Sequence, residues 1–225
     1  MINKISSLNG EGALTAEDIK IKNLFSAYPD ETQLFRQAET GAVISLLDGG
    51  VIISGNIIAD EVKSFLAFVK AKNVFSGADN MLALFGESGF EPLNTVILKK
   101  PPLKASGGFS EDLSSRDIYG ILSVDEFDLP PYEYFAADFC RRKNRGLLKV
   151  FAKRDLCAAI TLEGEDCRLI AGIASRQKGC GGALLLAAAT GTKPVLAVCR
   201  DELLPFYIKY GFEPFNKSGI RRKTN

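Results

Sequence analysis

The stretch DELLPFYIKYGFEPFN, residues 201–216, decides the fold because a second copy of it lies earlier in the chain. Residues 79–94 read DNMLALFGESGFEPLN and align with it without a gap. The signature GFEPxN recurs intact, at Gly89–Asn94 and at Gly211–Asn216. An internal repeat of this kind predicts that one supersecondary unit occurs twice.

The residues around both copies predict the same elements. A short apolar run precedes each copy, Asn73–Phe75 in the first and Pro194–Val198 in the second, and is typical of a buried strand. The aspartate that opens each copy suits a helix N-cap, and Gly89 or Gly211 suits the helix end. Each copy then enters another strand.

Two hairpins are predicted upstream of the copies. Residues 42–53 form two apolar runs around the turn Asp48-Gly49-Gly50, and residues 147–160 offer a similar pair that turns near Arg154-Asp155. The predicted order is helix, hairpin, strand, helix, strand, helix, strand, written twice. This is an α/β (mixed α+β) class with two tandem domains, each with a mixed, mostly antiparallel central sheet flanked by helices.

The domain boundary is placed at residues 101–108, PPLKASGG, because Pro, Gly and Ser are common in domain junctions. The predicted domains are residues 1–100 and 109–225. A long loop within one domain is the alternative interpretation.

Composition excludes several classes of protein. The 225 residues include 46% hydrophobic and 24% charged residues, as in a folded globular protein. Lys and Arg number 28 against 27 acidic residues, so no positive field exists to attract nucleic acid. No apolar stretch approaches the roughly 20 residues needed to cross a membrane, and the first residues do not resemble a signal peptide. We therefore expect no nucleic acid or membrane partner, and a cytoplasmic location.

Cysteine and histidine usage narrows the chemistry. The five cysteines are an odd number at irregular spacing, without a C-x-x-C pair, which favours reduced thiols over zinc or disulfides. The chain has no histidine, which excludes Ser-His and Cys-His catalysis and the usual histidine metal sites. We expect no metal, and proton transfer must use Tyr, Glu, Asp, Lys, Cys or water.

A glycine-rich loop lies ahead of the second copy. Residues 176–185 read RQKGCGGALL, between a predicted strand at 167–175 and a predicted helix at 182–190 that Gly191 stops. A diphosphate needs backbone N–H donors, glycines that let the backbone come close, and the positive end of a helix. Gly179, Gly181 and Gly182 supply these features.

This loop resembles the R/Q-x-x-G-x-G/A pyrophosphate loop of the GNAT acetyltransferases. Residues 205–212, PFYIKYGF, are similar to the F-Y-x-x-x-G-F segment of that superfamily. The resemblance implies two tandem GNAT-like domains, the first of them degenerate, and acetyl-CoA as cosubstrate. It also implies an N-acetyltransferase that acts on an amine by direct attack, with Tyr207 as general acid.

The same resemblance implies the other site residues. Backbone groups of Ile173, Ala174 and Ser175 would pair with the pantetheine arm like an added strand. The remaining predicted cofactor-binding residues lie in and after the loop: Arg176, Lys178, Gly179, Gly181, Gly182 and Ala183. Asp201 matches a position near the cofactor, although capping the helix that carries Tyr207 explains it equally well.

The first copy lacks these features. Residues 54–63 read SGNIIADEVK, with no glycine-rich loop and with acids that would repel a diphosphate at the helix start. The sequence therefore predicts that acetyl-CoA binds only to the C-terminal half.

The sequence gives less information about the acceptor of the acetyl group. Residues 123–134, SVDEFDLPPYEY, place carboxylates among aromatics in the region that borders the acceptor cleft by family analogy, where a cationic amine could stack. A surface loop with core-anchoring aromatics is the alternative. We expect a small-molecule or peptide amine as acceptor.

The sequence also leaves two alternative functions open and bears on the oligomeric state. The alternative function is a non-catalytic acyl-CoA-binding or regulatory protein, and a dinucleotide-binding module is weaker because the glycine loop lies late in the chain. The helix at 182–189 is apolar on all sides, so we expect the first copy or a second subunit, in a homodimer, to cover it.

Overall fold

The computed structural model describes residues 1–8, 15–86, 90–103, 108–109, 113–123 and 129–223. Its eleven strands belong to one mixed sheet in the order β1-β2-β3-β4-β5-β11-β6-β10-β9-β8-β7. The chain divides into two compact units, and neither is one continuous segment. The first comprises Met1–Ile97, Val198–Leu204 and Pro214–Asn225, and the second comprises Leu98–Ala197 and Pro205–Glu213.

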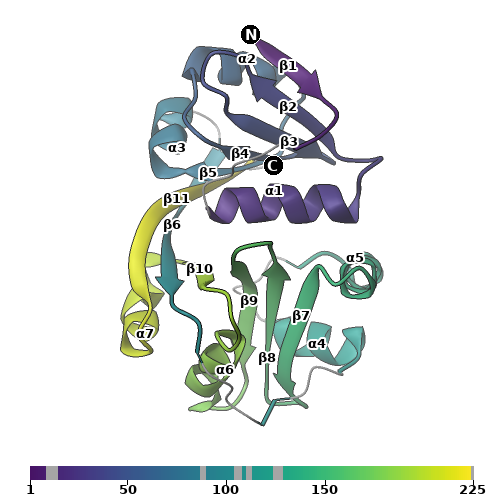
Figure 1. Ribbon diagram of the computed structural model, residues 1–225, viewed down its shortest axis with the longest axis vertical. Coiled ribbons are helices and arrows are strands. Elements are labelled where there is room, and N and C mark those ends of the chain that lie inside the picture. Colours follow the sequence, from purple (N-terminus) through teal and green to yellow (C-terminus); the bar gives the residue numbers. More distant parts are fainter. Residues whose placement is uncertain (9–14, 87–89, 104–107, 110–112, 124–128, 224–225) are drawn as a thin grey trace. The chain divides into compact units, whose positions relative to one another are not determined.

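The first unit is built around a mostly antiparallel part of the sheet (Figure 1). The pairs β1–β2, β2–β3 and β3–β4 are antiparallel, β4 and β5 are parallel, and β11 returns antiparallel to β5. Its elements along the chain are β1 (Ile2–Ile5), α1 (Ala16–Ala27), β2 (Gln33–Gln37), β3 (Val43–Leu47), β4 (Gly50–Ser54), α2 (Ala59–Phe68), β5 (Asn73–Gly77) and α3 (Ala78–Phe85).

The predicted hairpin of the first unit is confirmed as β3 and β4. Asp48 and Gly49 both have positive φ, 50° and 82°, which is the conformation that a two-residue turn needs to match the twist of the strands. The second predicted hairpin, β7 with β8, is also confirmed, and Asp155 in its turn has a φ of 60°.

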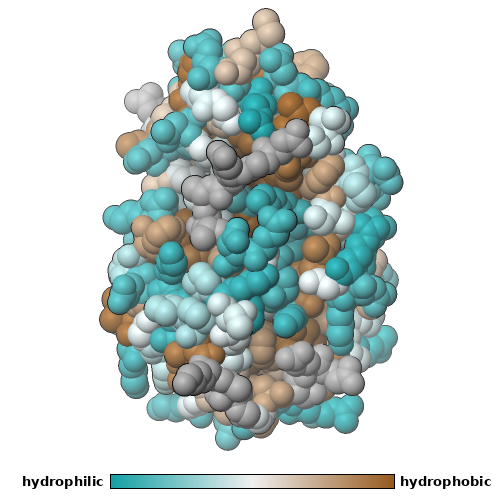
Figure 2. Space-filling model, viewed as in Figure 1, coloured by the Kyte–Doolittle hydropathy of each residue, from teal (hydrophilic) through white to brown (hydrophobic). Residues whose placement is uncertain are grey.

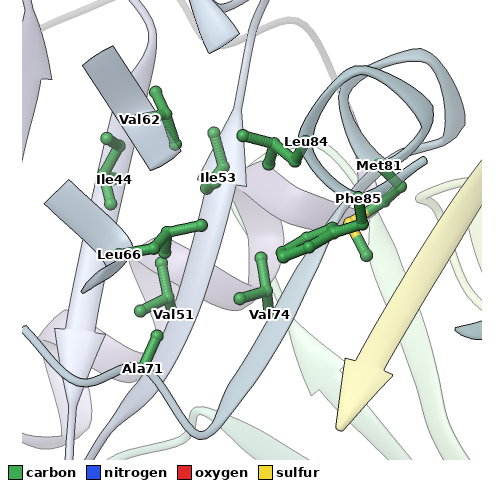
Figure 3. Packing of buried hydrophobic residues seen from close by; sticks show 10 residues of the cluster. All are labelled: Ile44, Val51, Ile53, Val62, Leu66, Ala71, Val74, Met81, Leu84 and Phe85. Atoms are coloured by element: carbon green, nitrogen blue, oxygen red, sulfur yellow. The ribbon is translucent and has the colours of Figure 1, made fainter. Parts of the chain in front are cut away.

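The core of the first unit lies between its helices and strands. Met81, Leu84 and Phe85 of α3 point toward strand residues such as Ile53 and Val74 (Figure 3). These buried side chains fix α2 and α3 against β4 and β5, so the first copy keeps the packing of the fold.

The second unit has helices packed on strands β7, β8 and β9. Its elements are α4 (Ser115–Leu122), α5 (Tyr132–Asn144), β7 (Leu148–Lys153), β8 (Cys157–Glu163), β9 (Arg168–Ser175), α6 (Cys180–Ala188) and α7 (Leu204–Lys209). The division between the units falls within β6 (Phe90–Lys100), β10 (Val195–Cys199) and β11 (Glu213–Lys223) and after the first residue of α7. The 3-10 turn η1 (Asp201–Leu203) belongs to the first unit.

The core of the second unit shows strand alternation. Ala158 and Ile160 of β8 pack in one cluster with Ile118 of α4 and Phe139 of α5. Because successive side chains of a strand point to opposite faces, the residues between them face the other side of the sheet. Helix α6 also packs on β8, and we place it on that other side.

Three predicted features differ from the observed ones, and a fourth falls outside the described residues. The structure has one sheet where the repeat predicted a sheet for each domain, because β11 returns to pair with β5. Helix α6 begins two residues before the predicted start, at Cys180. Asp79 is not an N-cap, since Gly77 holds that position and Asp79 lies in the first turn of α3. Gly89, the predicted helix end, lies outside the described residues, and α3 ends at Phe85.

The boundary at residues 101–108 stays a prediction, because residues 104–107 lie outside the described part of the chain. Leu103, which lies in this predicted linker, makes two backbone hydrogen bonds. Its amide donates to Ala189 O at 3.0 Å, and its carbonyl accepts from Gly191 N at 3.0 Å. The start of the predicted linker is thus bonded to the end of α6.

Within the described residues, no helix has both the length and the apolarity to cross a membrane. In Figure 2, hydrophilic residues cover much of the face shown, and hydrophobic residues lie between them in scattered groups.

Candidate functional site

The pairing of β9 with β10 ends part of the way along β9. The two strands are parallel, and only three residues of β9 pair with β10, from Arg168 to Ile170. Strand β9 nevertheless continues to Ser175 and remains paired with β8 on its other side. The edge from Ala171 to Ser175 therefore has no pairing with β10, and its backbone groups suit a ligand that adds as a strand.

A bulge in β9 lies where the pairing with β10 ends. Thr161 of β8 faces Ile170 and Ile160 faces Gly172, so Ala171 is an extra residue without a partner on β8. A bulge bends the strand and increases its twist. Ile173 and Ala174 follow on the same edge, so the predicted pantetheine residues lie on the part of β9 that β10 leaves unpaired.

The loop after β9 is short and internally bonded. The amide of Arg176 donates to Leu156 O at 2.7 Å, and Ser175 Oγ donates to Gln177 O at 2.7 Å. Gly179 then caps α6 with a φ of 93°, a left-handed conformation that favours glycine. These contacts fix the direction in which α6 starts.

The start of α6 suits an anion. Its first turn contains no acidic residue, and its first backbone N–H groups lack partners within the helix, as in any α-helix. Lys178 and Ala183 are exposed on either side of this turn. The predicted phosphate-binding residues thus come together at one helix end.

Packing explains why glycine is required at one position of this turn but not at the other. A Cβ on Gly182 would lie 1.9 Å from Tyr210 Cζ, so the Tyr210 ring occupies that space. A Cβ on Gly181 would lie 3.5 Å from Phe206 Cζ, which is an ordinary contact. Gly182 is therefore a packing glycine, whereas fold packing does not explain Gly181.

Arg176 has a partner that the sequence did not indicate. Its guanidinium donates to the carbonyl of Gly120, in the last turn of α4. A cation is favourable at that helix end. Because this partner is a backbone carbonyl, no side-chain pattern in the sequence could have revealed it.

Tyr207 lies in α7 and is only 4% exposed. Its ring packs edge-to-face on Phe206 at 5.5 Å and on Phe212 at 5.6 Å between centroids. The ring is therefore part of the core of the second unit. Tyr210, just after α7, is more exposed and was not singled out from the sequence.

Asp201 is the first residue of η1, and Arg200 holds the N-cap position. Asp201 is therefore not the cap. Burial, followed by the charges of Asp201 and Glu202, raises the pKa of the Cys199 thiol to about 11. Asp201 belongs to the first unit, and its predicted role near the cofactor stays a prediction.

The predicted acceptor segment is only partly described, since residues 124–128 lie outside the described chain. The described part joins an aromatic cluster, in which Tyr132 packs on Tyr119 at 5.4 Å and Tyr119 packs on Phe135 at 5.2 Å. Arg116 lies over the Tyr132 ring at 5.1 Å, so this ring can take a cation. In the described residues no group of three or more side chains suits a metal.

Two parallel strands of the first unit, β4 and β5, also stop pairing part of the way along. We call this place the first split, and the place where β9 and β10 stop pairing the second split. Their parallel pairing also covers three residues, and ends at Ile52 and Phe75. Beyond that point Ser76 Oγ donates to Ile53 O at 3.0 Å, and Asn80 Nδ2 donates to Gly55 O at 2.8 Å. Side chains therefore occupy the carbonyls that a strand-like ligand would need.

No family model matches the chain, and no curated protein matches it in sequence. Solved structures do match. A candidate acetyltransferase from Pyrococcus horikoshii has a TM-score of 0.60 at 13% identity, over 92% of this chain and 78% of its own. A tandem GNAT protein from the clavulanic acid biosynthesis pathway has a TM-score of 0.52 at 12% identity, over 95% of this chain and 89% of its own.

A third match is a GNAT-family acetyltransferase from Colwellia psychrerythraea, with a TM-score of 0.52 at 11% identity over 100% of both chains. At these identities the likeness shows the fold alone. The protein has the GNAT fold over nearly its whole length, and one of its structural neighbours is a tandem GNAT protein.

Proposed function

We propose that the protein is an acetyl-CoA-dependent N-acetyltransferase whose cosubstrate binds to the second unit. The observation that carries the proposal is the continuity of three features along the chain. The unpaired edge of β9, residues 171–175, leads into the loop at 176–179 and then into the acid-free start of α6. An edge for a pantetheine arm and a helix end for a diphosphate thus follow one another.

The proposed reaction is a direct transfer of the acetyl group. The neutral amine of a small molecule or peptide attacks the acetyl carbonyl carbon, a C–N bond forms, and the C–S bond breaks. The departing CoA thiolate then takes a proton, and the Tyr207 phenol is the proposed donor. The chain lacks histidine, so the proton of the amine passes to water or to a Tyr, Glu, Asp, Lys or Cys side chain.

A second candidate is a non-catalytic acyl-CoA-binding protein. The 4% exposure of Tyr207 between Phe206 and Phe212 favours it, because a core ring needs no catalytic role. Both candidates use the same binding surface. They differ only in whether the bound thioester turns over.

Two measurements test the proposal. Acetyl-CoA and CoA should raise the melting temperature, whereas NAD and ATP should not, because a ligand that binds only the native state stabilises it. A screen of amines with detection of the released CoA thiol then separates the candidates. A thermal shift without thiol release from any amine supports the binding protein, and no shift with acetyl-CoA or CoA contradicts both.

A further inference from the structure

Strand alternation places one buried cysteine under helix α6. Cys157 is the first residue of β8, and it is fully buried. Its neighbour Ala158 packs in the cluster that contains Ile118 of α4 and Phe139 of α5. Cys157 therefore points to the opposite face of the sheet, the face on which we place α6.

The loop brings a second cysteine back over that position. Cys157 lies opposite Ser175 in the β8–β9 pairing, and Cys180 is the first residue of α6. The intervening loop turns back on itself, since a Cβ on Gly181 would lie only 3.9 Å from Ser175 Cβ. The start of α6 thus lies beside the Ser175–Cys157 pair.

The two thiols are neighbours. Burial raises the pKa of the Cys157 thiol and a backbone hydrogen bond at Lys153 lowers it, while the charge and the side-chain hydrogen bond of Cys180 add smaller increases. Both cysteines are free thiols, and Cys180 is partly exposed while Cys157 is not. An oxidant from solvent therefore meets Cys180 first.

We propose that Cys157 and Cys180 form an oxidisable dithiol at the start of α6, with a hydroperoxide as oxidant. The Cys180 sulfur bonds to one oxygen of hydrogen peroxide, the O–O bond breaks, the thiol becomes a sulfenic acid, and one water leaves. The Cys157 sulfur then attacks the Cys180 sulfur, the S–O bond breaks, and a second water leaves. The net result is that two thiols and one hydrogen peroxide give one disulfide and two waters.

The disulfide would tie the start of α6 to β8. A disulfide holds its two Cα atoms about 4.4–6.8 Å apart, so the first turn of α6 loses the freedom to adjust to a ligand. This consequence rests on the proposed function, since the same turn is the proposed diphosphate site. Oxidation should lower acetyl-CoA affinity, and reduction should restore it.

Peptide mapping of the full chain tests the dithiol without any assay of function. The chain is treated with hydrogen peroxide, and its remaining thiols are alkylated before digestion. We expect a peptide pair linked through Cys157 and Cys180 that dithiothreitol separates. Exposed Cys140 is the internal control and should not enter this link. A wild-type chain in which Cys180 is oxidised to sulfinic acid while Cys157 stays alkylatable overturns the proposal.

The variant Cys157→Ala adds a second readout. Without its partner, Cys180 should stop at the sulfenic acid, which dimedone traps, and the wild-type chain should give far less adduct. Equal dimedone labelling of the two chains contradicts the dithiol. Acetyl-CoA titration is read separately, because absence of binding in the reduced chain argues against the proposed function, whereas the linked peptide and the dimedone labelling test the dithiol itself.

Discussion

The two splits in the sheet begin alike and end differently. In the first unit β4 and β5 pair over three residues, and in the second unit β9 and β10 also pair over three residues. The repeat alignment, extended back from Asp79 and Asp201, sets Phe75 against Ala197. Phe75 is the last residue of β5 that pairs with β4, and Ala197 is the last residue of β10 that pairs with β9, so the repeat found in the sequence matches the register found in the structure.

The difference lies in the next few residues. In the first split Ser76 donates a hydrogen bond to Ile53 O, near the end of β4, and Asn80 donates one to Gly55 O, just after β4. The alignment sets Ser76 against Val198 and Asn80 against Glu202. The side chain of Val198 has no polar hydrogen, and a carboxylate such as that of Glu202 accepts hydrogen bonds but does not donate them. The second copy therefore lacks the side-chain donors that bridge the first split.

The strands and helices next to the two splits differ as well, β4 from β9 and α2 from α6. Strand β4 continues two residues beyond its last pair with β5, whereas β9 continues five beyond its last pair with β10. Helix α2 has Asp60 and Glu61 in its first turn, and Glu61 accepts a hydrogen bond from Gln37 Nε2 at 2.5 Å. Helix α6 has no acid there. The first copy thus keeps the packing of the fold, while other groups replace those of the proposed binding site.

The largest effect expected is on turnover, from Tyr207→Phe. Tyr207 aligns with Phe85, and both are buried, at 4% and 5% exposure, so the ring alone serves packing. The hydroxyl is the difference between the copies, and a positioned proton donor contributes about a hundredfold to rate. Turnover with the true acceptor should fall by about that factor, while melting temperature and acetyl-CoA affinity change little. Undiminished turnover would remove Tyr207 from the mechanism.

The next effect is on affinity, from Gly181→Glu. The added carboxylate lies at the start of α6, where it repels a diphosphate. Acetyl-CoA affinity should fall by at least about tenfold, or about 1.4 kcal/mol. Gly181→Ala is the matched control, because its Cβ only touches the Phe206 ring at 3.5 Å and brings no charge. If both variants bind like the wild type, the diphosphate does not lie at this helix end.

The smallest effect is on the stability of the first unit, from Ser76→Ala. Ser76 is fully buried, and its loss leaves Ile53 O without its donor, at a cost of about 1 kcal/mol in the free energy of unfolding. Ser64→Ala is the control, since Ser64 Oγ donates to Asp60 O on the exposed side of α2 and its loss should cost little. Urea denaturation compares the two. Equal stability of the two variants would show that the bridge does not hold the first split closed.

The sequence predicted the elements better than their connections. The repeat, the hairpins at Asp48 and Asp155 and the strand before Arg176 follow from local patterns, and the structure confirms them. The return of β11 to β5 could not be predicted, because strand pairing across a long chain separation leaves no local pattern. The single sheet follows from that return.

The glycine pattern in the sequence predicted the place of the candidate site, but it did not predict why each position must be glycine. Gly179 needs its left-handed φ, and Gly182 makes room for Tyr210. Both facts depend on three-dimensional packing that a glycine pattern alone does not specify. The partner of Arg176 is the backbone of Gly120, and a backbone partner leaves no trace in residue type.

Isothermal titration calorimetry of the wild-type chain with acetyl-CoA tests the contrast between the two splits most directly. The first split is bridged by Ser76 and Asn80, and the second has an unpaired edge, so the titration should give one site per chain. Two equal sites per chain would contradict the account, because the bridged split would then bind acetyl-CoA as well as the open one.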